Sequence, residues 1–480
     1  MVIQHMEHIE SRPDKLYLLA GLLSLNFLLG HVSYAGEVRF TPFVGLKESY
    51  SDNILLAPKG QEEGEFVTEI SPGFSLQTTG SNFRSTVNYT LQNLYYLKDS
   101  NRNQAYNQLS ASSNAELVDD YFFFDVNANH TQAIANADEP VANNNIAVTS
   151  NRISVTSYNL SPYFRHSFRG IMDATLRYSY SEVDFRRDEL VDSTQSGVNL
   201  QLTSPQRTTG VSWGVNYSKT KSAFGTGNDF IFGRGSLQLG YRFTTRTNIY
   251  ATSGKEDNSF AVNNNQNIDQ SFWNVGAAWQ PSAQDSITVE FGDRFFGKTE
   301  RFGWRHNSRR LVFSVDYQEE LSTSALALLD QQQSGSTTMQ NQPINNIGTS
   351  ITSQVFVRSI GTATLTYAIS KTNIVMSYSN ERRKFQDTGE ISRIQFASAS
   401  VRVRASSAWA YSLGANWSNR YNSSTALKTS FTNINFSIQR QLTPLLQAVV
   451  AFNTSLQKSN NALTDYNENI LSIGITKTFN

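Results

Sequence analysis

The sequence contains no cysteine, which excludes disulfide bonds and thiolate-coordinated metal sites. It is also poor in charge, because Asp, Glu, Lys and Arg make up only 17% of its residues, whereas soluble domains carry about 25%. Its 40 basic and 40 acidic residues cancel, so no basic surface of the kind that binds nucleic acid is indicated. We therefore expect no nucleic-acid partner, and the low charge is unusual for a surface that faces only water.

Long apolar runs are missing as well. The only candidate, from Leu16 to Leu29, is shorter than the roughly 20 residues that a membrane-spanning helix needs. Arg12 and Lys15 precede this run and small residues follow it, which is the pattern of a cleaved secretory signal. We predict a signal peptide over residues 1–35, with an uncleaved anchor as the alternative, and expect any other membrane segments to be strands.

The chain shows instead an alternation of apolar and polar residues at a period of two. In one clear segment Phe83, Val87 and Tyr95 share one phase, while Arg84 and Thr86 share the other. Such alternation predicts a strand with one apolar and one polar face. Similar segments recur from Val38 to the end of the chain, and we count about 22 of them, using the even number that bacterial outer-membrane barrels have.

Short turns alternate with long polar loops along the chain. Short turns are predicted near residues 118–120, 167–170, 204–206, 244–246, 281–283 and 442–444, and long loops at 98–106, 133–149, 221–229, 257–267 and 458–466. Short periplasmic turns and long outer loops are typical of outer-membrane barrels. The alternative, a secreted sandwich, solenoid or propeller, would leave many strand edges exposed and gives no reason for aromatic residues to gather at strand ends.

We therefore predict an all-β fold, in which residues 36–480 form a single large antiparallel transmembrane β-barrel. The barrel is expected to lie in the outer membrane of a Gram-negative bacterium, surrounded by outer-membrane lipid.

The last strand, from Tyr466 to Asn480, is expected to pair with the first and close the barrel. Its apolar phase contains Leu471, Ile473, Ile475 and Phe479. We predict that Ile473, Ile475 and Phe479 form the C-terminal signal that the barrel-assembly machinery binds, although Asn480 follows the terminal aromatic residue.

Residues suited to catalysis are sparse. The exported chain keeps three histidines, and the best catalytic candidate that can be assembled is His130 with nearby Asp125 and Asp138. A polar wall or loop histidine is a far simpler interpretation, because a general base needs a specific geometry. No spacing of histidines suits a metal and no nucleophile elbow is present. We predict that the protein is not an enzyme and uses no metal or cofactor.

The polar phases predict the lumen. Five basic side chains are expected to face it, namely Arg84, Arg177, Arg234, Arg242 and Arg294. They indicate either a plain solvated wall or a conduit that hydrogen-bonds sugar hydroxyls or attracts anions. So many strands imply a wide lumen, either water-filled or plugged.

A siderophore-type receptor would carry a separate N-terminal plug domain, and because Val38 begins a strand directly after the signal, the sequence disfavours that class. Any constriction is expected from the loop at 322–349, which is rich in Gln, Ser, Asn and Gly.

Several short segments resemble the PEP-CTERM system-associated outer-membrane β-barrel family. The matching segments are residues 36–42, 50–53, 57–60, 66–73, 115–120 and 294–297, together with Tyr466, Glu468 and Asn469. The resemblance implies an outer-membrane role connected with the export of exopolysaccharide or sorted proteins, with periplasmic export components as possible partners. It supplies no catalytic or ligand-binding residues.

The function predicted from the sequence is thus an outer-membrane channel associated with exopolysaccharide export of the PEP-CTERM type. Two alternatives stay open: a general diffusion porin for small solutes, and a structural barrel whose outer loops bind surface glycan.

Overall fold

A computed structural model describes residues 36–185, 190–205, 209–225, 229–259, 267–333 and 354–479. Its strands form one 22-stranded antiparallel sheet, which is closed because β1 (Glu37–Ser51) pairs with β22 (Tyr466–Thr478). Closure leaves no row of unpaired backbone groups, which is the condition for strands to cross a bilayer. The predicted fold, a single antiparallel barrel of about 22 strands, is confirmed; the predicted signal peptide lies outside the described residues.

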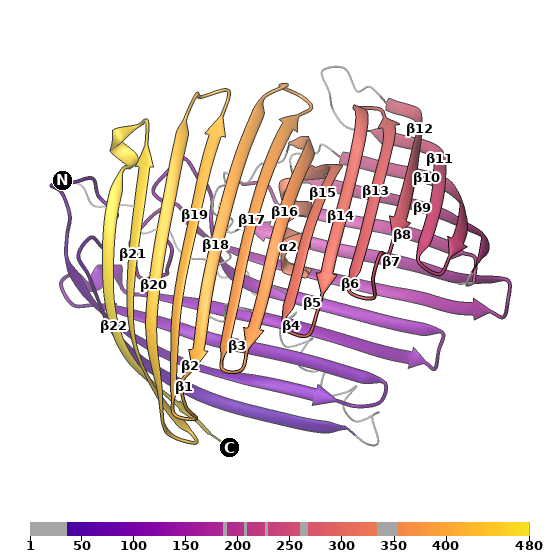
Figure 1. Ribbon diagram of the computed structural model, residues 1–480. Coiled ribbons are helices and arrows are strands. Elements are labelled where there is room, and N and C mark those ends of the chain that lie inside the picture. The colour runs from indigo at the N-terminus through magenta and orange to yellow at the C-terminus, as the bar shows by residue number, and fades with distance from the viewer. Residues whose placement is uncertain are drawn as a thin grey trace.

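Each strand pairs with the strands next to it in sequence, so the barrel is a continuous meander (Figure 1). The remaining strands are β2 (Glu65–Thr79), β3 (Phe83–Tyr96), β4 (Gln104–Val118), β5 (Phe122–Ile134), β6 (Arg152–Phe168), β7 (Met172–Phe185), β8 (Ser193–Thr203), β9 (Gly210–Phe224), β10 (Asp229–Thr244), β11 (Thr247–Ser259), β12 (Asn267–Trp279), β13 (Asp285–Arg294), β14 (Gly297–Asn307), β15 (Leu311–Thr323), β16 (Val355–Ile369), β17 (Thr372–Phe385), β18 (Ile391–Arg404), β19 (Trp409–Asn422), β20 (Lys428–Thr443) and β21 (Leu446–Ser459). One α-helix, α2 (Ser324–Gln333), and two short 3₁₀ turns, η1 (Ser100–Arg102) and η2 (Ala462–Thr464), complete the described chain.

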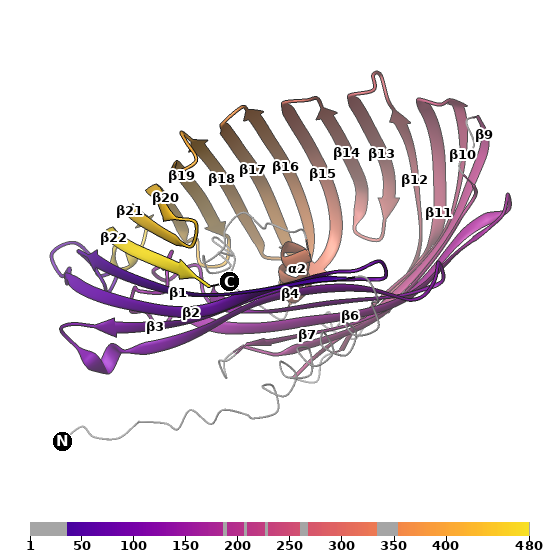
Figure 2. The same ribbon diagram turned by 90° about the horizontal axis from the view of Figure 1, so that it is seen from below.

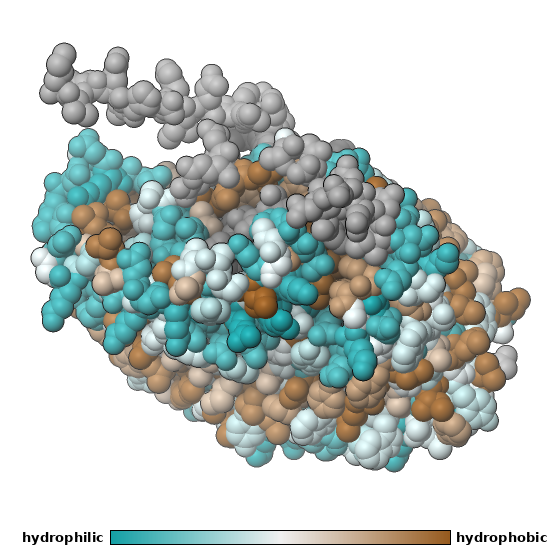
Figure 3. Space-filling model, turned by 90° about the horizontal axis from the view of Figure 1, so that it is seen from above, coloured by the Kyte–Doolittle hydropathy of each residue, from teal (hydrophilic) through white to brown (hydrophobic). Residues whose placement is uncertain are grey.

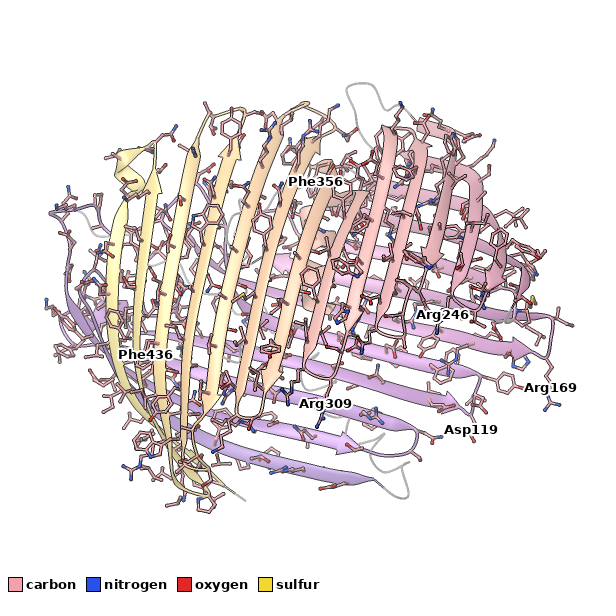
Figure 4. All side chains as sticks on the ribbon, in the orientation of Figure 1. Asp119, Arg169, Arg246, Arg309, Phe356 and Phe436 are labelled. Atoms are coloured by element: carbon pink, nitrogen blue, oxygen red, sulfur yellow. The ribbon has the colours of Figure 1, made fainter. Side chains whose placement is uncertain are left out.

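Apart from the two-residue turn between Arg294 and Gly297, which lies among the long loops, short turns and long loops lie at opposite ends of the barrel. Asp119, Arg169, Arg246 and Arg309 come from four different short turns and lie along the same end of the molecule (Figure 4). The start of β1 and the end of β22, where the described chain begins and ends, lie at this end as well. We call this the periplasmic end and the opposite, long-loop end the outer end.

The outward face of the wall is apolar. Leu237, Leu239, Tyr241 and Phe243 alternate along β10 and are each 47 to 54% exposed, although they are large hydrophobic side chains. Seen from above, hydrophilic side chains gather toward one end of the molecule, and hydrophobic and intermediate ones spread over the wall (Figure 3). A closed barrel with an apolar exterior belongs in a membrane, and we place the chain in the outer membrane. In the described part of the chain no helix is long and apolar enough to span a membrane.

Polar contacts reinforce the closing seam at its outer end. The carboxylate of Asp52 accepts hydrogen bonds from the backbone and side-chain nitrogens of Asn469, both at 2.7 Å. Beside it, the Ser51 hydroxyl donates to Glu468 at 2.9 Å. These two short segments both belong to the resemblance described above, and they come from opposite ends of the chain. The fold therefore joins them at the point where the barrel closes.

Replacing Asp52 with Ala should weaken the seam, because two backbone and amide donors of Asn469 lose their acceptor. We expect a loss of about 1–3 kcal/mol of stability. The measurement is the temperature at which the purified barrel loses its compact, heat-resistant form. Gln61→Ala, at an exposed position in the neighbouring loop, is the control; equal transition temperatures for the two variants would contradict the role of the seam.

The three residues of the predicted assembly signal stand on the lipid side of the barrel. Ile473, Ile475 and Phe479 are 61, 45 and 44% exposed, and the Phe479 amide donates to the Pro42 carbonyl oxygen at 2.8 Å. Their recognition by assembly machinery stays a prediction.

Phe479→Ala should lower the amount of folded protein in the outer membrane, because it removes the terminal aromatic residue of the signal. Phe436→Ala is the control, since Phe436 is also outward-facing and 40% exposed but lies within β20 (Figure 4). Membrane fractions are compared by the heat-modifiable band. A yield for Phe479→Ala that matches the control would show that the residue serves only as a lipid contact.

The barrel lumen as candidate functional site

The loop between β5 and β6, residues 135–151, folds into the lumen. Nine of its residues are at most 6% exposed: Ala135, Ala137, Val141, Ala142, Asn143, Asn145, Ile146, Ala147 and Asn151. Val141 and Ala142 pack with Phe431 of β20 and Tyr466 of β22, while Ile146 packs with Leu94 of β3 and Ile470 of β22. Burying one such valine or isoleucine contributes roughly 1.5–3 kcal/mol. We call this segment the inward loop.

Polar contacts fix the inward loop to the wall formed by β19, β21 and β22. The Tyr466 hydroxyl donates to the Val141 carbonyl oxygen. The side chain of Gln457, which is fully buried, accepts from the Val141 amide at 3.0 Å and donates to the Glu139 carbonyl oxygen at 3.2 Å. Arg420, only 5% exposed, forms an ion pair with Asp138. Since the loop begins at β5, these contacts carry it across the interior.

Further contacts hold the base of the inward loop. The Arg152 guanidinium donates to the carbonyl oxygens of Asn145 and Ala147 at 3.2 and 2.9 Å. The Tyr96 hydroxyl donates to the Ile146 carbonyl oxygen at 2.7 Å. The inward loop is thus a built element, in which buried backbone groups have partners.

Helix α2 lies within the ring of strands in two views at right angles to each other (Figures 1 and 2). The Thr323 hydroxyl accepts from the Leu326 amide at 3.2 Å, as an N-cap does. Ala325 and Leu329 pack on Ala133, Val155 and Val183, which belong to β5, β6 and β7. The helix therefore covers part of the inner wall near the base of the inward loop.

These observations place a second element in the lumen, besides the loop from which the constriction is predicted. Of the predicted segment 322–349, the described part contains α2, which lies in the lumen, and residues 334–349 fall outside the described residues. Among the described residues the inward loop is the element that reaches from β5 to the wall at β19, and the sequence suggested it only as a long polar loop. Its content of alanine, valine and isoleucine was the available signal, because a loop that only faces water has no need for them. A constriction by residues 334–349 stays a prediction.

In the outer half of the lumen, arginines are paired with buried carboxylates. Glu256 of β11 is 1% exposed, and Arg294 reaches its Oε1 at 2.6 Å, with Arg234 at 3.9 Å. Arg358 and Arg383 bracket Glu381 at 3.1 and 2.5 Å. Aromatic rings support both sets, since Arg234 lies over Phe272 and Arg383 over Phe356, which is labelled in Figure 4.

At the outer rim a further pair joins two loops. The Nη1 and Nη2 atoms of Arg102 donate to the two carboxylate oxygens of Glu63, at 2.8 and 3.2 Å. These hydrogen bonds lower the pKa of the Glu63 carboxyl below its usual value.

In the periplasmic half, four side chains form a layered stack on the inner wall. The rings of Phe123 and Tyr163 are parallel within 13°, with centroids 4.9 Å apart. The guanidinium of Arg177 lies 3.9 Å from the Tyr163 centroid, and that of Arg165 lies 4.5 Å from the Phe123 centroid. Arg177 also donates to Asp125 at 2.8 Å. Stacking fixes the two cations in place.

The five arginines predicted to face the lumen all occupy positions on the side opposite the lipid-facing residues. Arg234 and Arg294 lie in the outer half, where both contact Glu256. Arg84, Arg177 and Arg242 lie in the periplasmic half. Sequence reasoning therefore placed the cations on a face but could not show that two of them share one buried carboxylate. Their part in transport stays a prediction.

The predicted catalytic candidate is not assembled. His130 and Asp125 are five residues apart on β5, so they stand on opposite faces of the strand. His130 contacts Thr156, Asp125 binds Arg177, and Asp138 binds Arg420. Among the described residues no group of three His, Asp or Glu side chains could hold a metal.

No family model matches this chain, and no curated protein matches it. Solved structures do. The FrpB iron transporter from Neisseria meningitidis (F3-3 variant) has a TM-score of 0.50 at 11% identity, over 92% of this chain and 81% of that chain. A mutant of the ferric enterobactin receptor PfeA from Pseudomonas aeruginosa has a TM-score of 0.50 at 8% identity, over 92% and 80% of the two chains. The chain has the fold of a large outer-membrane barrel. Because the likeness is one of fold alone, the expectation that this chain is not a siderophore receptor stays a prediction.

Replacing residues 138–147 with a short Gly-Ser linker should raise single-channel conductance severalfold while the barrel still assembles, because that loop crosses the lumen. Deleting α2, residues 324–333, should raise it less, since α2 packs against β5, β6 and β7. Replacement of the exposed loop 423–427, at the same end, is the control. Planar-bilayer recordings compare the three variants; unchanged conductance after removal of 138–147 would refute the inward loop as the constriction.

Proposed function

We propose that this protein is a gated outer-membrane channel that passes a hydrophilic polymer, an exopolysaccharide of the kind associated with PEP-CTERM systems, from the periplasm to the cell surface. The observation that carries the proposal is the combination of a wide polar lumen with an inward loop fixed by buried contacts. A 22-stranded wall encloses a lumen far wider than a small solute requires.

The inward loop separates this proposal from a general diffusion porin. A porin works with a lumen that is always open to water, whereas here Gln457, Tyr466 and Arg420 hold a buried segment across the outer half. Such a segment suits a channel that is closed at rest and opens when its cargo or a partner displaces the loop.

The lining of the lumen suits carbohydrate. Amide and hydroxyl side chains face inward on many strands, such as the half-buried Ser412 and Ser437, whose hydroxyls hydrogen-bond at 2.6 Å. Aromatic rings lie among them, including Tyr250, whose hydroxyl donates to Glu290 at 2.6 Å. Sugar hydroxyls need donors and acceptors of this kind. The resemblance to the PEP-CTERM-associated barrel family points to the same cargo.

Transport as a class of function also agrees with the similar structures, one of which is named an iron transporter and the other a ferric enterobactin receptor. An iron chelate is therefore the competing cargo. An iron chelate would need a binding site for a compact ligand on the outer side of the barrel. Export of a polysaccharide would instead need a path through which a polymer can leave.

Deleting the gene from its natural host should reduce secreted exopolysaccharide severalfold and leave uptake of small sugars and growth on ferric chelates unchanged. Re-expression of the full chain should restore secretion. Re-expression of the Phe436→Ala variant should restore it as well, because that substitution lies on the outward face of β20 and leaves the lumen unchanged. Secreted polysaccharide is measured as hexose and uronate in the medium.

Three results would contradict the proposal. Normal secretion with impaired sugar uptake would favour the porin, and normal secretion with impaired growth on a ferric chelate would favour the receptor. If secretion, uptake and growth were all normal, the structural or glycan-binding barrel would be favoured.

A further inference from the structure

The arginines of the inner wall differ in their partners between the two halves of the barrel. In the outer half Arg294, Arg358, Arg383 and Arg420 are at most 16% exposed, and each has a carboxylate partner. Pairing of this kind offsets the cost of burial and stabilises the wall. These cations are already neutralised and leave little charge for a ligand.

The periplasmic half has the opposite arrangement. Besides Arg177, which binds Asp125, and besides Arg242 and the strand-end Arg404, five arginines stand there on five strands that are spread around the barrel: Arg39 on β1, Arg84 on β3, Arg165 on β6, Arg305 on β14 and Arg402 on β18. Alternation puts all five on the lumen side, opposite lipid-facing neighbours such as Phe40 and Trp304. All five are exposed, and among the described residues no carboxylate lies within 4.0 Å of any of them. We call them the mouth arginines.

Acidic residues at the same level are largely occupied. Asp125 is bound by Arg177 and by Asn114, at 2.8 and 2.9 Å. Asp173 accepts from the Ser167 hydroxyl at 2.6 Å, and Glu116 accepts from the Asp120 amide at 2.5 Å. These acids keep their negative charge, as does the exposed Glu37 in the lumen phase of β1, but none of them lies within 4.0 Å of a mouth arginine.

The short turns add to this positive charge. In the described turns at the periplasmic end there are five basic residues, Arg169, Arg246, Arg309, Arg310 and Lys371, against two acidic ones, Asp119 and Asp120. Charges of one sign around an opening with low-dielectric walls concentrate ions of the opposite sign in it. The periplasmic mouth thus attracts anions.

We propose that the periplasmic mouth captures an acidic polysaccharide, one whose repeating units carry carboxylate groups, as it enters the channel. This inference rests on the proposed export function and adds the charge of the cargo and its point of entry. Guanidinium groups bind carboxylates through paired hydrogen bonds, which favours uronate-type sugars. The mouth arginines are distributed over five strands, so a single small anion cannot contact them all, whereas a flexible charged chain can contact several at once.

The test measures binding of polygalacturonate and of neutral dextran of equal length to the full chain folded in detergent, by titration calorimetry. One variant replaces all five mouth arginines with Gln. The control variant replaces five basic residues that alternation places on the lipid side, namely Arg382, Lys384, Arg393, Arg440 and Lys477, with Gln. Because binding at the mouth does not require an open channel, the inward loop can stay in place.

We expect wild type and control to bind polygalacturonate, with an affinity that falls as salt rises, and to bind dextran far more weakly. The five-arginine variant should bind polygalacturonate at least about tenfold more weakly, a change of about 1.4 kcal/mol. Should that variant fail to give a heat-resistant barrel, the single variants Arg84→Gln and Arg165→Gln replace it, each with an expected loss of about twofold, a change of about 0.4 kcal/mol.

Equal affinity for dextran and polygalacturonate, or an affinity that the mouth substitutions leave unchanged, would overturn the inference. Displacement of the polymer by equimolar inorganic phosphate would also overturn it, because it would indicate a site for one free anion. These failures are distinguishable from failure of the proposed function: secretion of a neutral polysaccharide that depends on this protein would leave export standing while refuting an acidic cargo.

Discussion

Closure of the sheet between β1 and β22 is the constraint on which the rest of the structure depends. A strand that crosses a bilayer has no water to satisfy its N–H and C=O groups, so every edge must find a partner. Here the partners are the first and last strands, which pair from Phe43 with Thr478 to Ser51 with Ile470. The Asp52 carboxylate then binds Asn469 just beyond the paired region. A chain that is not complete from β1 to β22 cannot satisfy this condition.

The wall of the barrel could be predicted from the sequence because its rule is local. A period of two assigns Leu237 and Arg242 to opposite faces of β10 without any knowledge of the neighbours. Turn length likewise assigns the two ends. The contents of the lumen follow no such rule. The inward loop is held by Gln457 and Tyr466, more than 300 positions away in the sequence. Nothing near residues 135–151 encodes that contact except an excess of small apolar side chains, and the shared carboxylate of Arg234 and Arg294 was hidden for the same reason.

A wide barrel also creates a problem that its wall cannot solve. Twenty-two strands enclose more space than inward-pointing side chains can fill, so the interior must hold either water or further chain. In this protein the inward loop and α2 occupy part of the outer half of the lumen. The burial of charged pairs such as Arg420 with Asp138 follows from that choice, since a segment that covers the wall removes water from the charges beneath it.

The same choice explains the two halves of the inner wall. Where chain covers the wall, an arginine without a carboxylate would carry a large desolvation cost, so pairing is required. Where the lumen is open to the periplasm, Arg84 keeps its hydration, and Arg165 lies over the Phe123 ring while its charge has no carboxylate partner. Their positive charge is therefore not imposed by the fold, because glutamine or serine would serve a solvated wall equally well. Exposed arginines repeated on five strands around one opening are the feature on which the proposed capture of an acidic polymer rests.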